Sequence, residues 1–224
     1  MTSKARYFHI VVSGLALLCA FFSNLPAATT GQIKGVVPLP KSAAPTAAAK
    51  KYFGKISGKV DKAPAPIAGV WLEKTDLSAP KKATPVTMGQ KNYQFSSFLI
   101  IVPKGTRVHF PNKDSDYHNI YSLSRTKKFD LGRYKKDEKP SPSVLFDKPG
   151  FVALHCEIHD HMKANIIVVD SPYFMVTDSQ GAFTLKNIPP GNYTLHAQID
   201  RKTKWKIPVQ VSANRTAQVK FPSK

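Results

Sequence analysis

From Tyr93 to the C-terminus the chain is a succession of short β-branched and aromatic segments separated by turn residues. Apolar residues alternate in Phe151–Cys156, and Ala164–Val169 is a short unbroken apolar run; both patterns are typical of strands. Turn residues in Asp178–Gly181 and Pro189–Gly191 separate later segments. Since no stretch carries a convincing helical stripe of about three turns, the sequence predicts an all-β chain of the sandwich type.

Further strands are expected where β-branched and aromatic residues lie between turns, which the 12 Gly and 18 Pro residues help to supply. The expected segments are Ile56–Val60, Ile67–Leu72, Tyr93–Val102, Arg107–Phe110, Ala182–Leu185, Tyr193–Ala197 and Lys206–Val211. Residues 29–55, which include an Ala-, Pro- and Lys-rich stretch, show no apolar periodicity and are interpreted as a linker.

The first 28 residues have the layout of a secretory signal peptide. Lys4 and Arg6 precede an apolar run from Ile10 to Phe22, and small residues follow towards Ala28. A run of roughly 13 residues is short for a membrane helix, which needs roughly 20. We therefore expect cleavage near residue 28, a mature chain without a transmembrane span, and a periplasmic or secreted location; an uncleaved anchor is the alternative.

Cleavage would remove Cys19 and leave Cys156 as the single cysteine. A lone cysteine in an exported chain cannot form an internal disulfide, and a loose thiol would be oxidised or mispaired. The loop His155–Met162, between two expected strands, combines thiol, imidazole and thioether groups. Such soft donors suit copper and not calcium or magnesium.

Two histidines and one cysteine in a plane, with a weak axial methionine, make the mononuclear blue-copper arrangement. Cys156, His159 and Met162 supply three of these donors, so one more histidine is needed. His118 is the natural candidate, because it follows an upstream strand and the loops of two strands can meet at one end of a sandwich.

Other interpretations of the same loop stay open at this point. Zinc could take Cys156, His118, His159 and His161 in a tetrahedral site. His161 could also compete with Met162 for the axial position, or Cys156 could simply be buried. Three further histidines of the mature chain are expected away from any metal: His155 and His109 by strand alternation, and His196 because it lies in the other domain.

The stretch from about Thr84 to Asp170 resembles the cupredoxin family, of the plastocyanin and amicyanin type. The matching motifs are Phe110–Asn112, His118–Asn119 and Cys156-x2-His159-x2-Met162. The resemblance implies a Greek-key β-sandwich over 84–170 that transfers single electrons and is not an enzyme.

In this family one type 1 copper is held by two histidines, a cysteine and a methionine, which implies His118, Cys156, His159 and Met162 here. The residue after the first histidine braces the cysteine sulfur through its backbone N–H, which implies Asn119. Tyr117 is a departure, since plastocyanin-like chains commonly carry proline there; it removes no ligand.

A second resemblance covers Phe174–Leu195, which is similar to the middle of a carboxypeptidase regulatory-like β-sandwich of the transthyretin-like fold. The opening strands of such a domain are missing directly before residue 171, whereas segments in 56–75 match them. We therefore expect the cupredoxin domain (84–170) to be inserted into a regulatory-like sandwich formed by 56–75 and 171–224. The alternative is that 56–75 adds strands to the cupredoxin.

The resulting hypothesis is an exported electron carrier; the competing one is a copper-binding module for protein or glycan binding, or for copper handling, without electron transfer. The sequence has 33 Lys and Arg against 14 Asp and Glu, a net charge of +19. Positive charge accelerates encounter with anionic partners. We therefore expect an acidic redox partner protein or an anionic envelope surface, and no nucleic acid.

Overall fold

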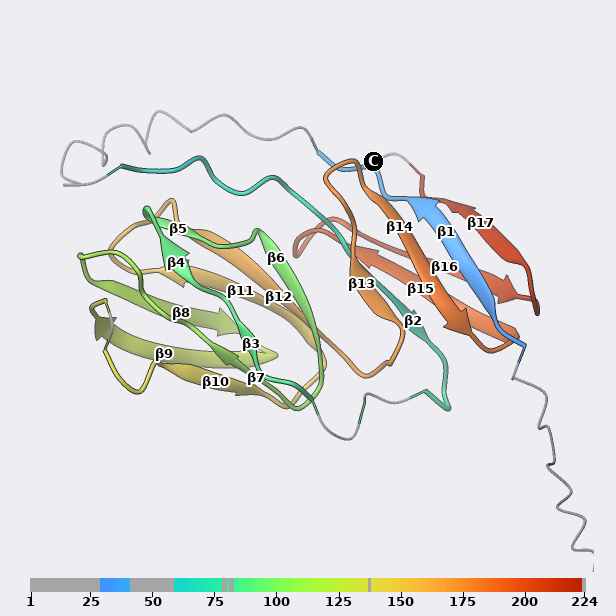
Figure 1. Ribbon diagram of the computed structural model, residues 1–224, viewed down its shortest axis with the longest axis horizontal. Coiled ribbons are helices and arrows are strands. Elements are labelled where there is room, and N and C mark those ends of the chain that lie inside the picture. Colours follow the sequence, from blue (N-terminus) through green and yellow to red (C-terminus); the bar gives the residue numbers. More distant parts are fainter. Residues whose placement is uncertain (1–28, 41–58, 78–79, 81–82, 137, 223–224) are drawn as a thin grey trace, which may run out of the picture.

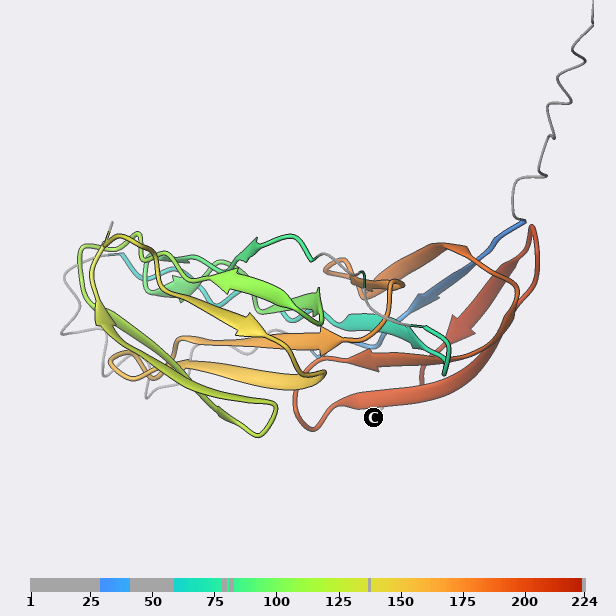
Figure 2. The same cartoon turned by 90° about the horizontal axis from the view of Figure 1, so that it is seen from below.

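The computed structural model describes residues 29–40, 59–77, 80, 83–136 and 138–222. All regular elements in this part of the chain are β-strands, and they form two sandwiches placed side by side along the long axis (Figures 1 and 2). The prediction of an all-β sandwich architecture is confirmed. Among the described residues no helix could cross a membrane. The expected signal peptide, residues 1–28, lies outside the described residues.

The first sandwich packs a five-stranded sheet against a three-stranded sheet. The larger sheet has the order β6 (Leu99–Pro103), β12 (Lys163–Val169), β11 (Gly150–Cys156), β8 (His118–Ser124) and β9 (Lys127–Tyr134). The smaller sheet has the order β10 (Ser143–Phe146), β7 (Thr106–His109) and β3 (Val86–Thr87), and a short hairpin joins β4 (Gln90–Lys91) to β5 (Gln94–Phe95). Alternate residues of β11, namely Val152, Leu154 and Cys156, are buried in the core of this sandwich.

The second sandwich packs a four-stranded sheet against a three-stranded sheet. The order of the larger sheet is β13 (Phe174–Val176), β2 (Gly69–Glu73), β15 (Gly191–Gln198) and β16 (Lys204–Val211). The smaller sheet has the order β14 (Ala182–Ile188), β1 (Gly31–Val36) and β17 (Thr216–Lys220). Its core is separate from the first and contains Ile33, Leu72, Phe183 and Leu195.

Strand β1 corrects the expectation that 29–55 is a linker throughout. Residues 31–36 form the central strand of a sheet, antiparallel to β14 and parallel to β17. Gly31, Ile33 and Gly35 are buried while their neighbours are more exposed, which is the period-two pattern of a strand. A Cβ at Gly35 would lie 2.6 Å from the carbonyl oxygen of Val219, so glycine permits the close approach of β17. The segment has only two β-branched residues, Ile33 and Val36, and they do not alternate, so its strand pattern is weak in the sequence.

The expected strand at 56–60 is also corrected where the structure describes it. Lys59 and Val60 are in no strand, and Val60 packs against the core of the first sandwich; residues 56–58 lie outside the described residues. The neighbouring expectation at 67–72 corresponds to β2, which pairs with β13 and β15. Strand β2 therefore belongs to the second sandwich and has no ladder with the first among the described strands.

The expected single strand Tyr93–Val102 is interrupted. Asn92 and Tyr93 have φ angles of 51° and 58° and form the tight turn between β4 and β5. The chain then leaves β5 at Phe95 and starts β6 at Leu99. The break lies at residues 96–98, where Ser96 and Ser97 separate β5 from β6, so the apolar residues on either side do not form one continuous strand.

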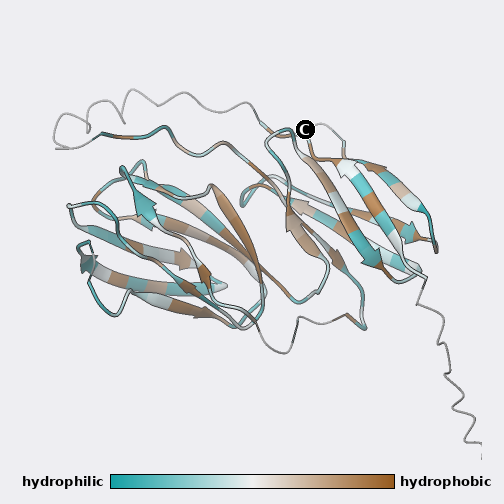
Figure 3. Cartoon of the chain, in the orientation of Figure 1, coloured by the Kyte–Doolittle hydropathy of each residue, from teal (hydrophilic) through white to brown (hydrophobic). Residues whose placement is uncertain are grey.

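An apolar junction joins the two sandwiches, and strands β6 and β12 are hydrophobic along most of their length (Figure 3). Alternate residues of β12 point into the first core, whereas Ile167 and Val169 pack outward with Trp71 and Phe174 of the second sandwich. A Cβ at Gly69 would lie 2.7 Å from Ile167 Cδ1, so β2 approaches closely there. Burial on both faces explains the unbroken apolar run in β12.

Candidate metal centre

The donor residues lie at the end of the first sandwich that is remote from the second (Figure 1). His118 begins β8 and Cys156 ends β11, while His159 and Met162 lie in the loop between β11 and β12. Because β8 and β11 are antiparallel neighbours, with Cys156 opposite Ile120, the start of one meets the end of the other. The sheet thus brings together residues 38 positions apart in the sequence.

Three donor atoms converge at this position: the ligand atoms of His118, Cys156 and His159 all lie within 4.8 Å of one another. Cys156 Sγ is 3.7 Å from His118 Nδ1 and 3.6 Å from His159 Nδ1, and the two nitrogens are 3.2 Å apart. Metal bonds of about 2.0–2.1 Å to imidazole and about 2.3 Å to thiolate separate donors that share one ion by about 3.3–3.8 Å. The three side chains therefore fit around a single metal ion.

Burial controls the protonation of the thiol. Removal from water raises the pKa of Cys156, and the nearby Glu157 carboxylate raises it further. Backbone hydrogen bonds from Asn119, His159 and Ile158 to the sulfur act in the opposite direction. The Asn119 contact is the brace that the cupredoxin resemblance implies. A buried thiol of raised pKa is a weak free nucleophile, and a bound cation would favour its thiolate form.

Both histidines are held neutral, as metal ligation requires. Burial is the main cause of the lowered pKa of His118, partly offset by Asp114. Burial, followed by repulsion from His118 and His161, lowers the pKa of His159 to about 4. At neutral pH the imidazoles therefore carry no charge that would repel a cation.

Met162 lies at the end of the loop, directly before β12. Its side chain is fully buried in the same core as Cys156. Its N–H donates to the His159 carbonyl at 2.9 Å, and its own carbonyl accepts from the Cys156 N–H at 3.3 Å. These two bonds close the loop into a compact turn that ties the Met162 backbone to that of both neighbouring ligands.

The other histidines are outside the group of three. His161 Nε2 lies 3.0 Å from the carbonyl oxygen of Tyr93, so this nitrogen already has an acceptor. The His155 ring packs against Tyr121 with a centroid distance of 5.5 Å. In the second sandwich His196 stacks on Trp71 and lies 2.6 Å from Glu73 Oε2.

Residues that sequence reasoning missed surround the centre. The Asp114 carboxylate lies 2.9 Å from His118 Nε2 and is almost fully buried. Tyr93 is buried, its ring centroid lies 5.1 Å from that of His159 in an edge-on arrangement, and its hydroxyl bonds Asp116. The acidic residues just before His118 in the sequence could have indicated that a carboxylate, here that of Asp114, contacts this histidine. Tyr93 had no such signal, because it comes from a distant hairpin.

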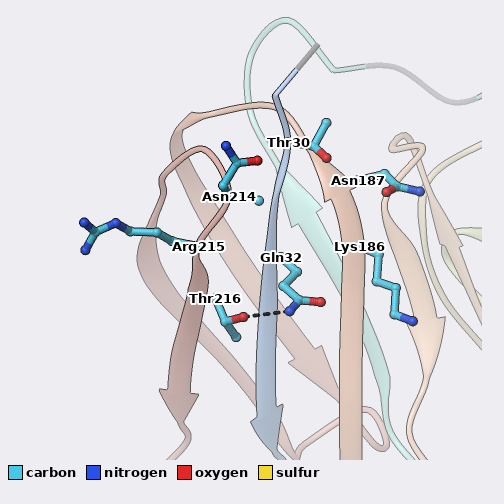
Figure 4. Close-up of a pocket in the computed structure, with 8 residues that line it drawn as sticks. Thr30, Gln32, Lys186, Asn187, Asn214, Arg215 and Thr216 are labelled. Carbon is cyan, nitrogen blue, oxygen red and sulfur yellow. Dashed lines mark hydrogen bonds between the residues drawn. The ribbon is translucent and has the colours of Figure 1, made fainter. Parts of the chain in front are cut away.

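Pockets border the donor cluster and the strands of the second sandwich. One of about 440 Å³ is beside His159 and is lined by Tyr117, Arg133, Lys135 and Ile158 among others. The second, of about 340 Å³, is in the second sandwich and is lined by polar side chains around β1 (Figure 4). There Gln32 donates to Thr216 at 2.6 Å, while Arg215 points away from the pocket (Figure 4).

Comparison with known proteins gives matches among solved structures only. No family model and no curated protein matches the chain. The solved structures to which it is similar include a copper-containing nitrite reductase from Thermus scotoductus, with 26% identity over 39% of this chain and 23% of that one, at a TM-score of 0.36. This chain therefore spans less than a quarter of the reductase.

Smaller copper proteins match over nearly their full length. A purple cupredoxin from Nitrosopumilus maritimus is 20% identical over 38% of this chain and 99% of that one, with a TM-score of 0.33. Amicyanin from Paracoccus versutus is 18% identical over 45% of this chain and 97% of that one, with a TM-score of 0.34. Since all three TM-scores are below 0.5, the proposals below depend on the geometry of the metal centre.

Proposed function

We propose that the chain is an exported type 1 copper protein that carries single electrons between redox partners and catalyses no reaction of its own. The observation that carries this proposal is the convergence of Cys156 Sγ with Nδ1 of His118 and His159. Two imidazoles and one thiolate would form the plane of a blue-copper site, and Met162, buried in the same loop, would supply the weak fourth donor.

The surroundings favour copper over zinc. A structural zinc site needs a fourth strong ligand, and His161 would be the nearest candidate. His161 does not belong to the group of three whose donor atoms converge, and neither does any carboxylate of the described residues. Met162 remains as the fourth donor, and a thioether is a soft ligand that suits copper.

When bound, copper would supply a reversible one-electron couple. The chain contributes a preformed donor geometry, because His118 and Cys156 are set in paired strands and the loop to Met162 is closed by two backbone bonds. Burial of Cys156 and His118 excludes water from the sulfur and from one imidazole. A rigid, dry site needs little rearrangement when its charge changes by one.

Electrons would enter and leave near His159, which is the least buried of the three donors. It lines the 440 Å³ pocket together with Tyr117 and Ile158, two of the exposed large hydrophobic residues of the described chain. Arg133 and Lys135 form the basic side of this pocket. We therefore propose an acidic redox protein as the partner, since opposite charge accelerates encounter and apolar contact excludes water.

The domain organisation is proposed in a revised form. The copper-binding unit covers about 84–170, and the second unit combines β1 and β2 with 171–224. Strand pairing of β1 with β14 and of β2 with β15 supports this division. The resemblance of 174–195 to carboxypeptidase regulatory-like domains agrees with the seven strands in two sheets.

Addition of Cu(II) to the purified metal-free protein tests the proposal. We expect an intense visible band from thiolate-to-copper charge transfer and an EPR spectrum typical of type 1 copper, at one copper per chain. Addition of Zn(II) at equal concentration serves as the competitor. A colourless copper complex, or zinc bound in preference to copper, would contradict the assignment.

The axial ligand is tested by a pair of variants. With Met162 axial, Met162→Gln should keep the visible band but lower the reduction potential by about 60 mV or more, a tenfold change in a one-electron equilibrium, because an oxygen donor favours Cu(II). His161→Ala should keep the visible band and shift the potential much less than Met162→Gln, because His161 would only anchor the loop through the Tyr93 carbonyl. The opposite pattern, measured by redox titration, would make His161 the axial ligand.

A further inference from the structure

The turn between β4 and β5 lies against both loops that carry the metal donors. Its two residues, Asn92 and Tyr93, both have positive φ angles, 51° and 58°, which is uncommon for side chains other than glycine. Two-residue hairpin turns of this kind usually contain glycine. Non-glycine residues in this conformation persist only where the surroundings hold them, and they gather at functional sites.

On one side the turn holds the carboxylate behind His118. The N–H of Asn92 donates to Asp114 Oδ1 at 2.6 Å, and the N–H of Tyr93 donates to Asp114 Oδ2 at 3.0 Å. The same Oδ2 is 2.9 Å from His118 Nε2. An ionised carboxylate only accepts hydrogen bonds, so Nε2 carries the proton and Nδ1 presents its lone pair towards Cys156 and His159.

On the other side Tyr93 bonds to the loop that carries His159. His161 Nε2 donates to the Tyr93 carbonyl oxygen at 3.0 Å, which anchors the loop between His159 and Met162. The buried Tyr93 ring lies edge-on to both donor imidazoles, with centroid distances of 5.1 Å to His159 and 5.9 Å to His118. Its hydroxyl donates to Asp116, in the segment that leads to His118.

We infer that the Asn92–Tyr93 turn is a clamp that positions the metal centre, in which Asp114 and Tyr93 act on His118 and His159 without touching the metal. Backbone N–H groups fix the carboxylate, the carboxylate fixes the tautomer and tilt of His118, and the Tyr93 carbonyl and ring fix the second loop. The consequence for the copper potential rests on the proposed function; the positioning itself applies to any divalent ion held by these donors.

The clamp has two measurable consequences. A histidine whose second nitrogen donates to a carboxylate is a stronger donor, which favours Cu(II) over Cu(I). Loss of such a partner commonly costs 10- to 100-fold in metal affinity. The change in potential and the change in metal affinity both depend on the position and charge of the Asp114 carboxylate, which is not a ligand. A residue that only stabilised the fold would not change the two together.

Asp114→Asn is the direct test, with Asp114→Glu as the conservative rescue and Asp147→Asn, on an exposed ion pair with Lys127, as the matched control. We expect Asp114→Asn to weaken Co(II) binding 10- to 100-fold and to raise the copper potential by about 60 mV, which is tenfold in the one-electron equilibrium. Asp114→Glu should recover part of the Co(II) affinity and part of the original copper potential, and Asp147→Asn should change neither quantity.

Tyr93→Asn tests the contribution of the Tyr93 ring and hydroxyl to the clamp. The backbone N–H and carbonyl stay in place, since asparagine tolerates the left-handed backbone that the turn requires. We expect metal dissociation to accelerate about tenfold or more while circular dichroism stays unchanged. Because Tyr93 and Asp114 are hydrogen-bonded to each other and belong to one network around the two imidazoles, their effects on Co(II) affinity should be less than additive when combined. If Asp114→Asn does not fold, the dissociation rate of Tyr93→Asn decides the question.

The clamp would be overturned if the effects of the two variants on Co(II) affinity were additive. It would also be overturned if neither variant changed the Co(II) affinity or the copper potential. The readouts separate this outcome from failure of the proposed function. If the wild-type protein binds Co(II) but gives no blue copper complex, the electron-transfer proposal is wrong while the affinity series still tests the positioning.

Discussion

Cys156→Ser is expected to abolish the intense visible band of the copper-loaded protein completely. The band depends on the bond between copper and a thiolate, and a serine hydroxyl would neither lose its proton nor mix its orbitals with copper in the same way. Sulfur is also the softest donor of the group of three, so we expect copper affinity to fall by at least 10- to 100-fold. Visible absorption during a copper titration measures both effects.

Two controls keep this result interpretable. Cys156 is 2% exposed, and a buried hydroxyl without a partner costs about 1–3 kcal/mol, so thermal unfolding must show that the variant is folded. His155→Ala changes the neighbouring residue, whose ring packs on Tyr121 outside the donor cluster, and should keep the band. A folded Cys156→Ser protein that remains blue would show that the thiolate is not the source of the colour.

Removal of strand β1, by starting the chain at residue 41, is expected to unfold the second sandwich while the metal centre survives. The strand pairs with β14 on one side and β17 on the other, so its loss leaves two unpaired edges. It also removes the fully buried Ile33 and Val37, at about 1.5–3 kcal/mol each. Together these losses are a large part of the roughly 5–15 kcal/mol by which a domain is stable.

Calorimetry should show unfolding of both sandwiches in the full chain and of the first sandwich alone in the shortened chain. The shortened chain should keep the visible spectrum of its copper complex. Gly35→Ala is a milder version, because the new Cβ would lie 2.6 Å from the Val219 carbonyl oxygen. Gly89→Ala is its control, since its Cβ would meet nothing closer than 3.9 Å. An unchanged second transition without residues 29–40 would contradict the assignment of β1.

Much of the metal centre could be read from local spacing. The loop from Cys156 to Met162 presents its donors within one short turn, so their proximity depends on few residues and is visible in the sequence. Strand alternation correctly placed Cys156 inward and His155 outside the donor cluster. His118 could be inferred as well, because neighbouring antiparallel strands bring the start of one to the end of the other.

Strand identity and partners were harder to predict. The period-two pattern of β11 and the apolar run of β12 are visible in the sequence, because the buried positions of these strands carry apolar residues. Strand β1 has a weak strand pattern, because glycines occupy two of its three buried positions. These glycines allow it to fit between β14 and β17. The turn at Asn92–Tyr93 lies at the start of the expected strand Tyr93–Val102, and it contains no glycine, the usual marker of such a turn.

The residues and spacing of the donors were thus determined by the sequence, since they are local properties. The tertiary structure alone decided which opening strand completes the second sandwich, and which distant hairpin supports the donors. Pairing of β1 with β17 and bonding of Tyr93 to Asp114 join segments far apart along the chain. Such contacts depend on complementary shape and on hydrogen-bond partners for buried N–H and carboxylate groups. A single sequence does not show which distant groups become these partners.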